Sequence, residues 1–285
     1  MPDHVLTEEP LQFGEGGRLF GILTLPSVPP CNAQALPVFV FLNAGLLNRV
    51  GPYRLYVRLV RNLAQMGFSS LRVDLAGRGD SPERFGLTNQ QSVAADYEEI
   101  VGVLESRLGR LRLVLGGLCS AADNAIRLAR ADQRVIGMLL LDPVCSLDDG
   151  FRARAVIMNY TNPARYLVWL KRRLNLLATL PGENWNDSEM IDPLTLRDAP
   201  TGEQLRAAFE AICERRGRVL SVFTQYATQY YNQLGQLGRT LDVVGYQRFC
   251  TEIFWPQMAH TYTLELHRRR LIEEIKNWAG GYIRP

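Results

Sequence analysis

Short apolar segments alternate with amphipathic segments along most of the chain. Residues 38–42 are apolar at every position, which is typical of a parallel strand buried on both faces. In residues 53–67 the apolar positions recur at helical spacing, and the segment closes at Gly67. The alternation continues with predicted strands at 69–75, 111–118 and 135–144 and predicted helices at 88–107 and 120–131. This pattern predicts βαβ units and therefore a mostly parallel sheet.

The alternation is interrupted between residues 147 and 206, where apolar and basic helical segments occur without a strong strand. Before it, residues 11–25 predict a hairpin with a Gly-rich turn. After it come a helix, a strand, a strand-like segment and a last helix, at 203–217, 218–224, 246–254 and 262–279. We therefore predict one α/β domain formed by residues 1–146 and 207–285, with residues 147–206 inserted as a helical lid.

The composition limits the classes of function. The chain has 285 residues, of which 47% are hydrophobic and 21% charged, as in ordinary globular proteins. Its net charge is only +3, so we expect no nucleic-acid partner. We also expect no membrane span and no signal peptide, because the sequence shows no long apolar run and its N-terminus is polar. A cytoplasmic location is the corresponding expectation.

Cysteine and histidine are scarce and widely spaced. The five cysteines form no CxxC pair, which argues against a disulfide framework and a zinc site, so we expect no metal and no cofactor. The three histidines are His4, His260 and His267. An enzyme with an imidazole base must use one of them.

The sharpest local motif is Gly-Leu-Cys-Ser-Ala at residues 117–121, where an apolar strand gives way to a helix. A strained strand-to-helix turn presents a nucleophile and requires small residues two positions before and after it. Centred on Cys119, these positions are Gly117 and Ala121; centred on Ser120, one of them is Leu118, which would clash. Cys119 is therefore the preferred nucleophile. The alternative is a Gly-rich strand end with a buried structural cysteine.

Together with the Asn-Ala-Gly at 43–45, the turn at 74–81 and the Ala-His-Thr at 259–261, this motif resembles the α/β-hydrolase superfamily over essentially the whole chain. The resemblance implies an α/β-hydrolase fold, with a mostly parallel central sheet flanked by helices. Within the superfamily, the sequence looks most like serine-aminopeptidase-like hydrolases of bacterial biosynthetic clusters, whose R-x-G-P-x-R stretch is similar to residues 49–54. Serine is the usual nucleophile, and cysteine occurs in dienelactone hydrolases and polyhydroxyalkanoate synthases.

The resemblance implies that His260 is the base, because it follows the last strand and precedes the final helix. The usual acid is missing, since residues 221–233 contain neither Asp nor Glu. Pancreatic-type lipases place their acid after the preceding strand in a similar Leu-Asp-Pro context, so we predict Asp142. Weaker alternatives are a Cys-His dyad or one of the carboxylates Asp148, Asp149 and Asp242.

By the same resemblance, the backbone amides of Leu46 and Ser120 are expected to form the oxyanion hole. Arg49 and Arg54 lie just beyond Leu46 and are candidates to bind a substrate carboxylate or phosphate, or else to form surface salt bridges. The turn at 74–81 is interpreted as structural, packing beside the sheet.

A cysteine paired with an imidazole at a helix N-terminus is expected to be partly thiolate and to attack an ester or thioester carbonyl. Water would then resolve the acyl-enzyme in a hydrolase. An alcohol, amine or thiol would resolve it in an acyltransferase or cyclase. A third hypothesis is a non-catalytic binding protein on the same fold.

The substrate is expected to be a small-molecule or carrier-bound acyl compound. Four aromatic residues are candidates to bind it: Tyr166 and Trp169 in the insertion, and Tyr226 and Tyr230 after the strand that lacks an acid. For Tyr166 and Trp169 the alternative is packing against the core.

Overall fold

A computed structural model describes residues 6–27, 36–45, 47–161 and 198–283. Within them the chain forms an eight-stranded sheet in the order β1-β2-β4-β3-β5-β6-β7-β8. β1 pairs antiparallel with β2 and β2 with β4, and all the other pairs are parallel. The strands are β1 (Thr7–Phe13), β2 (Leu19–Leu25), β3 (Val38–Phe41), β4 (Ser70–Asp74), β5 (Leu113–Leu118), β6 (Val135–Leu141), β7 (Arg218–Thr224) and β8 (Cys250–Trp255).

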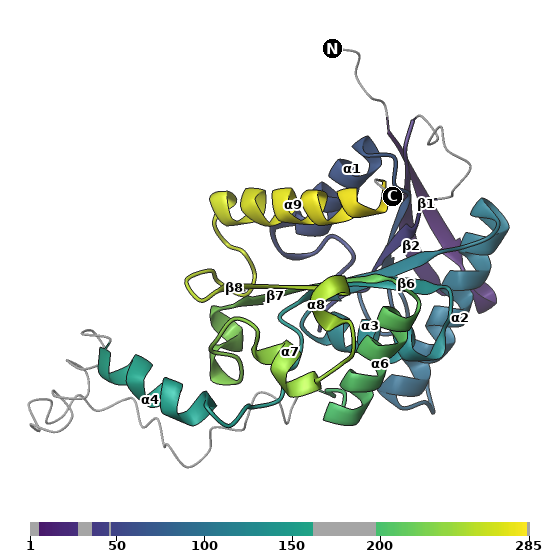
Figure 1. The fold of residues 1–285 in the computed structure, drawn as a ribbon. Coiled ribbons are helices and arrows are strands. Elements are labelled where there is room, and N and C mark those ends of the chain that lie inside the picture. The colour runs from purple at the N-terminus through teal and green to yellow at the C-terminus, as the bar shows by residue number, and fades with distance from the viewer. Residues whose placement is uncertain (1–5, 28–35, 46, 162–197, 284–285) are drawn as a thin grey trace, which may run out of the picture.

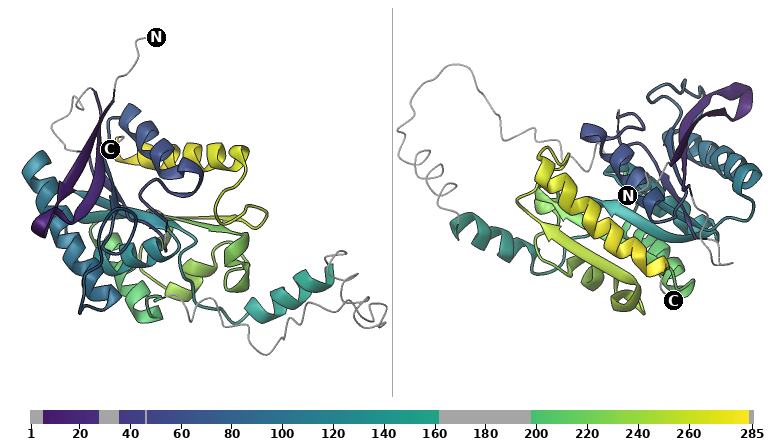
Figure 2. Two further views of the ribbon diagram at one scale, coloured as in Figure 1. Left: turned by 180° about the vertical axis from the view of Figure 1, so that it is seen from behind. Right: turned by 90° about the horizontal axis from the view of Figure 1, so that it is seen from above.

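Helices cover both faces of the sheet, so its central strands are buried on both sides (Figure 1). Helices α1 (Leu55–Gln65) and α9 (Glu265–Ala279) pack together on one face. Helices α2 (Asn89–Leu108), α3 (Ser120–Ala131) and α6 (Gly202–Glu214) cover the other, as the views in Figure 2 also show. All four side chains of β3 are buried, which explains why this segment is apolar at every position.

Local sequence signals set the helix boundaries. Thr88 caps α2 with a capping box, because its side chain accepts from the Gln91 amide while the Gln91 side chain accepts from the Thr88 amide. In α1, Leu55, Leu59 and Leu63 recur every four residues and are all buried. The predicted helices and strands of the sheet region are thus confirmed, with boundaries shifted by a few residues.

The predicted strand at 246–254 is wrong over its first four residues. They form the short helix α8 (Tyr246–Phe249), and β8 begins only at Cys250. Gly245, with φ of 81°, allows the turn that starts the helix. The Tyr246 ring stacks on Phe209 with ring centroids 5.8 Å apart, and this packing overrides the β propensity of the segment.

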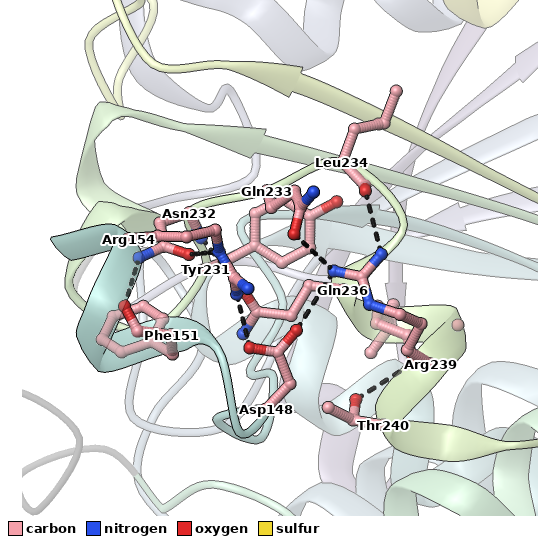
Figure 3. A network of polar contacts seen from close by, with 12 residues as sticks. Asp148, Phe151, Arg154, Tyr231, Asn232, Gln233, Leu234, Gln236, Arg239 and Thr240 are labelled. Carbon is pink, nitrogen blue, oxygen red and sulfur yellow. Dashed lines mark hydrogen bonds and ion pairs between the residues drawn. The ribbon is translucent and has the colours of Figure 1, made fainter. Parts of the chain in front are cut away.

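The predicted insertion contains helix α4 (Phe151–Thr161), which Figure 1 shows extending away from the sheet. Its base is tied to the core by a polar network, drawn in Figure 3. Arg154 pairs with Asp148 and donates to the Asn232 side chain at 2.8 Å, and Arg239 pairs with Asp148 from helix α7 (Gln236–Leu241). Residues 162–197 lie outside the described part of the chain, so the division into core and lid stays a prediction.

Strand register aligns the carboxyl ends of the central strands. Leu118 at the end of β5 pairs with Leu141 at the end of β6, and Leu141 pairs with Val222 in β7. The three strands therefore end side by side. In parallel α/β sheets the carboxyl edge is where ligands bind. Among the described residues, no helix combines the length and apolar character required to cross a bilayer.

Candidate active site

Cys119 lies on a strained turn between β5 and α3. Its backbone has φ of 57° and ψ of −120°, a conformation that non-glycine residues rarely adopt. The turn is crowded, because a Cβ at Gly117 would lie 2.5 Å from the Ala121 Cβ and 2.8 Å from the Leu42 carbonyl oxygen. Small residues at these two positions therefore allow the turn. The geometry is that of a nucleophile elbow centred on residue 119.

His260 and Asp142 meet at this elbow. Nδ1 of His260 lies 2.6 Å from Oδ2 of Asp142, and the imidazole also makes a side-chain hydrogen bond with Cys119. The Asp142 side chain is fully buried, whereas the His260 side chain keeps 24% of its surface exposed. With Nδ1–H donating to the carboxylate, the other ring nitrogen is the one available for the thiol.

The electrostatics of this group favour a charged imidazole. Burial lowers the pKa of His260, but the hydrogen bonds and negative charges of Asp142 and Cys119 outweigh it. The net effect raises the pKa of His260 from 6.5 to about 9. At neutral pH the imidazole therefore carries a proton while paired with the sulfur and the carboxylate.

Thr224, at the end of β7, holds the Asp142 carboxylate. Its amide donates to Oδ1 and its hydroxyl to Oδ2, each at 2.6 Å. Both residues are fully buried. Asp142 itself has φ of 50°, and its amide donates to the Val222 carbonyl at 2.7 Å. The sequence marked the end of β7 only as the place where an acid was missing, so Thr224 was not identified.

One of the predicted aromatic residues contacts the imidazole, and a second packs against the first. The Tyr226 ring packs against His260, with centroids 4.3 Å apart and an interplanar angle of 31°. Tyr230 meets Tyr226 edge-on at 6.3 Å, and its hydroxyl contacts the Asp142 carbonyl at 3.5 Å. Tyr231, next in sequence, instead stacks on Phe223 within the core.

The loop after β3 approaches the elbow from the other side. The Gly45 amide donates to the Ser120 hydroxyl at 2.9 Å. Ser120 is the first residue of α3, where backbone N–H groups have no intrahelical acceptor, which suits a predicted oxyanion donor. Leu46, the other predicted donor, lies outside the described residues.

The two arginines of this loop differ. Arg49 forms ion pairs with Asp74 and with Asp80, the latter at 2.7 Å, so its guanidinium is engaged within the protein. Arg54 is exposed at the end of the short 3-10 helix Pro52–Arg54. A substrate-binding role for either arginine stays a prediction.

Tyr56 packs beneath the elbow and was not identified from the sequence. Its hydroxyl accepts a hydrogen bond from the Leu118 amide at 2.8 Å, directly before Cys119. Burial raises the pKa of Tyr56, so it stays a neutral phenol. An aromatic residue inside an amphipathic helix carries no sequence signal that separates this role from ordinary core packing.

The remaining candidates lie elsewhere. Asp148 is paired with Arg154 and Arg239, while Asp149 and Asp242 are exposed. His267 lies in α9. Outside the described residues are His4, Tyr166 and Trp169. Within the described ranges, no cluster of three or more His, Cys, Asp or Glu side chains could hold a metal ion.

Comparison with known proteins gives a fold and no close relative. No protein-family model matches the chain, and no curated protein matches it in sequence. Many solved structures are similar, however. The ferulic-acid-bound Est1E of Butyrivibrio proteoclasticus is 16% identical, with a TM-score of 0.54, covering 94% of this chain and 96% of that one.

Two further structures are equally informative. A dienelactone hydrolase from Anabaena variabilis is 12% identical with a TM-score of 0.53, covering 98% of this chain and 99% of that one. A Pyrococcus furiosus esterase is 12% identical with a TM-score of 0.55, covering 97% of this chain and 91% of that one. With this sheet order and these neighbours, the protein has the α/β-hydrolase fold, as the sequence predicted.

Proposed function

We propose that this protein cleaves an ester or thioester through an acyl-enzyme on Cys119, with His260 as base and Asp142 as acid. The observation that carries the proposal is the continuous hydrogen-bonded series from Cys119 to His260 to buried Asp142, centred on a strained elbow. A buried structural cysteine would need neither the strain nor the charged partner. The esterases and the dienelactone hydrolase among the structural neighbours support the same reaction class.

In the first half-reaction the Cys119 sulfur attacks the substrate carbonyl while His260 holds the proton. Negative charge develops on the carbonyl oxygen, where backbone amides stabilise it; Ser120 is one donor and Leu46 the other. The tetrahedral intermediate then collapses. His260 passes its proton to the leaving alcohol or thiol, and a thioester to Cys119 remains.

In the second half-reaction His260 accepts a proton from water as the water attacks the thioester, and the free acid leaves. Asp142 keeps the imidazole in the tautomer that serves both steps and stabilises its positive charge. Tyr226 packs against the imidazole and borders the space where the acyl group reacts. We therefore include Tyr226 and Tyr230 among the substrate-contacting residues.

Incubation with p-nitrophenyl esters and acyl thioesters, followed by intact-mass measurement, tests the proposal. We expect an acyl adduct on the wild type and none on Cys119→Ala. In His260→Ala we expect the rate at which the adduct forms or decays to change. Cys250→Ala is the matched control, because Cys250 is another partly exposed thiol, whose pKa is raised by its hydrogen bond to Cys213 and by burial. Neither adduct nor turnover across a broad panel would refute the proposal and favour a binding protein.

The same measurement separates hydrolysis from acyl transfer. An adduct that decays in water alone identifies a hydrolase. An adduct that persists in water and is released when amines, alcohols or thiols are added identifies an acyltransferase. Release can be followed by mass spectrometry of both protein and product.

A further inference from the structure

Two cysteines outside the candidate active site lie with their thiols in contact. Cys213 is near the end of α6, and Cys250 is the first residue of β8. They are 37 positions apart in the sequence, yet their Sγ atoms lie 3.9 Å from each other. This spacing matches no recognised cysteine motif, so the sequence alone does not indicate that the two thiols meet.

The thiol pair lies at the edge of the sheet opposite the candidate active site. Cys250 pairs with Val219 at the start of β7, whereas Thr224, beside the candidate active site, ends that strand. The two strands run parallel, so their first residues share one edge of the sheet. Chemistry at the thiol pair is therefore independent of the reaction proposed at Cys119.

Both cysteines belong to backbone that is fixed by hydrogen bonds. Helix α6 ends in a Schellman motif, in which the Gly217 amide donates to the Ile212 carbonyl at 2.8 Å. In the same motif the Arg216 amide donates to the Cys213 carbonyl at 3.0 Å. Cys250 is held by the ladder between β7 and β8. The contact between the two sulfur atoms is thus set by ordered elements on both sides.

The two thiols differ in their protonation. Cys213 keeps 6% of its surface exposed, and Cys250 is partly exposed. The hydrogen bond from Cys250 lowers the pKa of Cys213 and outweighs the opposing effect of burial. The same hydrogen bond, together with burial, raises the pKa of Cys250. Cys213 is therefore the better nucleophile, with Cys250 as the adjacent thiol that can react with its oxidised form.

We propose that Cys213 and Cys250 are a redox-active pair, which hydrogen peroxide converts into a disulfide linking α6 to β8. The Cys213 thiolate attacks one peroxide oxygen, the O–O bond breaks, hydroxide leaves, and a sulfenic acid forms. The Cys250 sulfur then attacks the Cys213 sulfur, and the S–O bond breaks. The departing hydroxide takes the Cys250 proton and leaves as water. The two sulfur atoms together lose two electrons, which the peroxide gains.

The disulfide ties the last strand of the described sheet to a helix that covers it. To form it, rotation of the two side chains has to bring the sulfur atoms from 3.9 Å to about 2 Å. A cross-link between residues 37 positions apart reduces the conformational entropy of the unfolded chain. We therefore expect the oxidised protein to be more stable than the reduced protein.

The test uses the Cys119→Ala protein, so that the proposed nucleophile does not consume the oxidant. The protein is treated with hydrogen peroxide and denatured, its remaining thiols are alkylated, and intact and peptide masses are measured. We expect a product lighter by two hydrogen atoms, in which one cross-linked pair of peptides contains Cys213 and Cys250. Its melting temperature is expected to rise by about 5 to 10 °C. Dithiothreitol restores both thiols and the original melting temperature.

Two variants of the Cys119→Ala protein serve as controls. Cys145→Ser removes a buried thiol whose pKa is raised to about 12, mainly by burial, and the disulfide is expected to form as before. Cys250→Ser removes the thiol that reacts with the sulfenic acid. We expect the sulfenic acid at Cys213 to persist in this variant and to be trapped by dimedone.

Three outcomes overturn the inference. One is that Cys213 and Cys250 both remain open to alkylation after peroxide treatment. Another is a cross-link that joins either of them to a different cysteine or to a second molecule. The third is conversion of Cys213 to a sulfinic acid while Cys250 is present, which would show that the second thiol does not react in time. None of these outcomes bears on the proposed reaction at Cys119.

Discussion

Replacing Asp142 by Asn tests whether Asp142 is the acid of the proposed site, because the structure determines the orientation of the new side-chain amide. The Thr224 amide can only donate, and it points at Oδ1. In Asp142→Asn the side-chain oxygen is therefore held at that position, and the new NH₂ group takes the place of Oδ2, facing Nδ1 of His260. The imidazole must then accept at Nδ1 and carry its proton on the nitrogen that faces Cys119, which is the wrong tautomer for a base.

The expected loss of kcat/KM in Asp142→Asn follows from the pKa of His260. Its rise from 6.5 to about 9 corresponds to roughly 3 kcal/mol of stabilisation of the imidazolium. Asp142 supplies the larger part of the favourable interactions, and the opposing effect of burial remains after the substitution. We therefore expect the pKa of His260 to fall to its ordinary value or below. With the tautomer change added, kcat/KM falls about 10³-fold.

The assay combines ester kinetics with NMR titration of the histidine ring signals. Only three histidines have to be assigned, and His4 and His267 provide internal references. Asp242→Asn is the matched control. Asp242 has φ of 49°, close to the 50° of Asp142, but it is exposed, so its substitution makes the same chemical change away from the elbow.

The reasoning is refuted if Asp142→Asn keeps wild-type kcat/KM, or if the pKa of His260 stays near 9 in that variant. The first result would identify a Cys-His dyad. The second would mean that Cys119 alone holds the proton on His260. A loss of activity equal to that of Asp242→Asn would instead reflect a nonspecific effect of the substitution.

Three further predictions concern pH, strain and capping. In the proposed mechanism His260 must be protonated to release the leaving group, and its pKa is raised to about 9, so we expect kcat/KM to fall as the pH rises through 9. A Cys119→Ser variant needs a neutral imidazole, so we expect its activity to rise with pH instead. Profiles of kcat/KM against pH measure both. Gly79→Ala lowers the free energy of unfolding by at least about 2 kcal/mol in urea titrations, since its Cβ meets buried Asp74. Thr88→Ala removes the cap of α2 and costs about 1 kcal/mol in the same titrations, with kcat unchanged.

The fold could be predicted because its signals are local. The apolar run of β3, the capping threonine of α2 and the small residues around Cys119 each show their structural role within a few positions of sequence. The strand predicted at 246–254 failed because α8 depends on the contact of Tyr246 with Phe209, 37 residues earlier, which no local pattern contains.

The site was predictable to the extent that it follows a sequence pattern. Asp142 and His260 are 118 residues apart, and a resemblance to known enzymes was needed to pair them. Thr224 could not be identified, because a threonine at a strand end is common. Its contact with the Asp142 carboxylate arises only when the fold brings β6 and β7 side by side.

The register of β5 against β6 has a consequence for heat inactivation. Cys119 and Asp142 directly follow the paired residues Leu118 and Leu141, and the Cys119 amide donates to the Leu141 carbonyl at 2.8 Å, so their separation changes only if the centre of the sheet melts. His260 is carried by the connection between β8 and α9, outside any ladder. If His260 is the base of the proposed site, we expect activity to be lost on warming first through displacement of His260, below the temperature at which the protein unfolds.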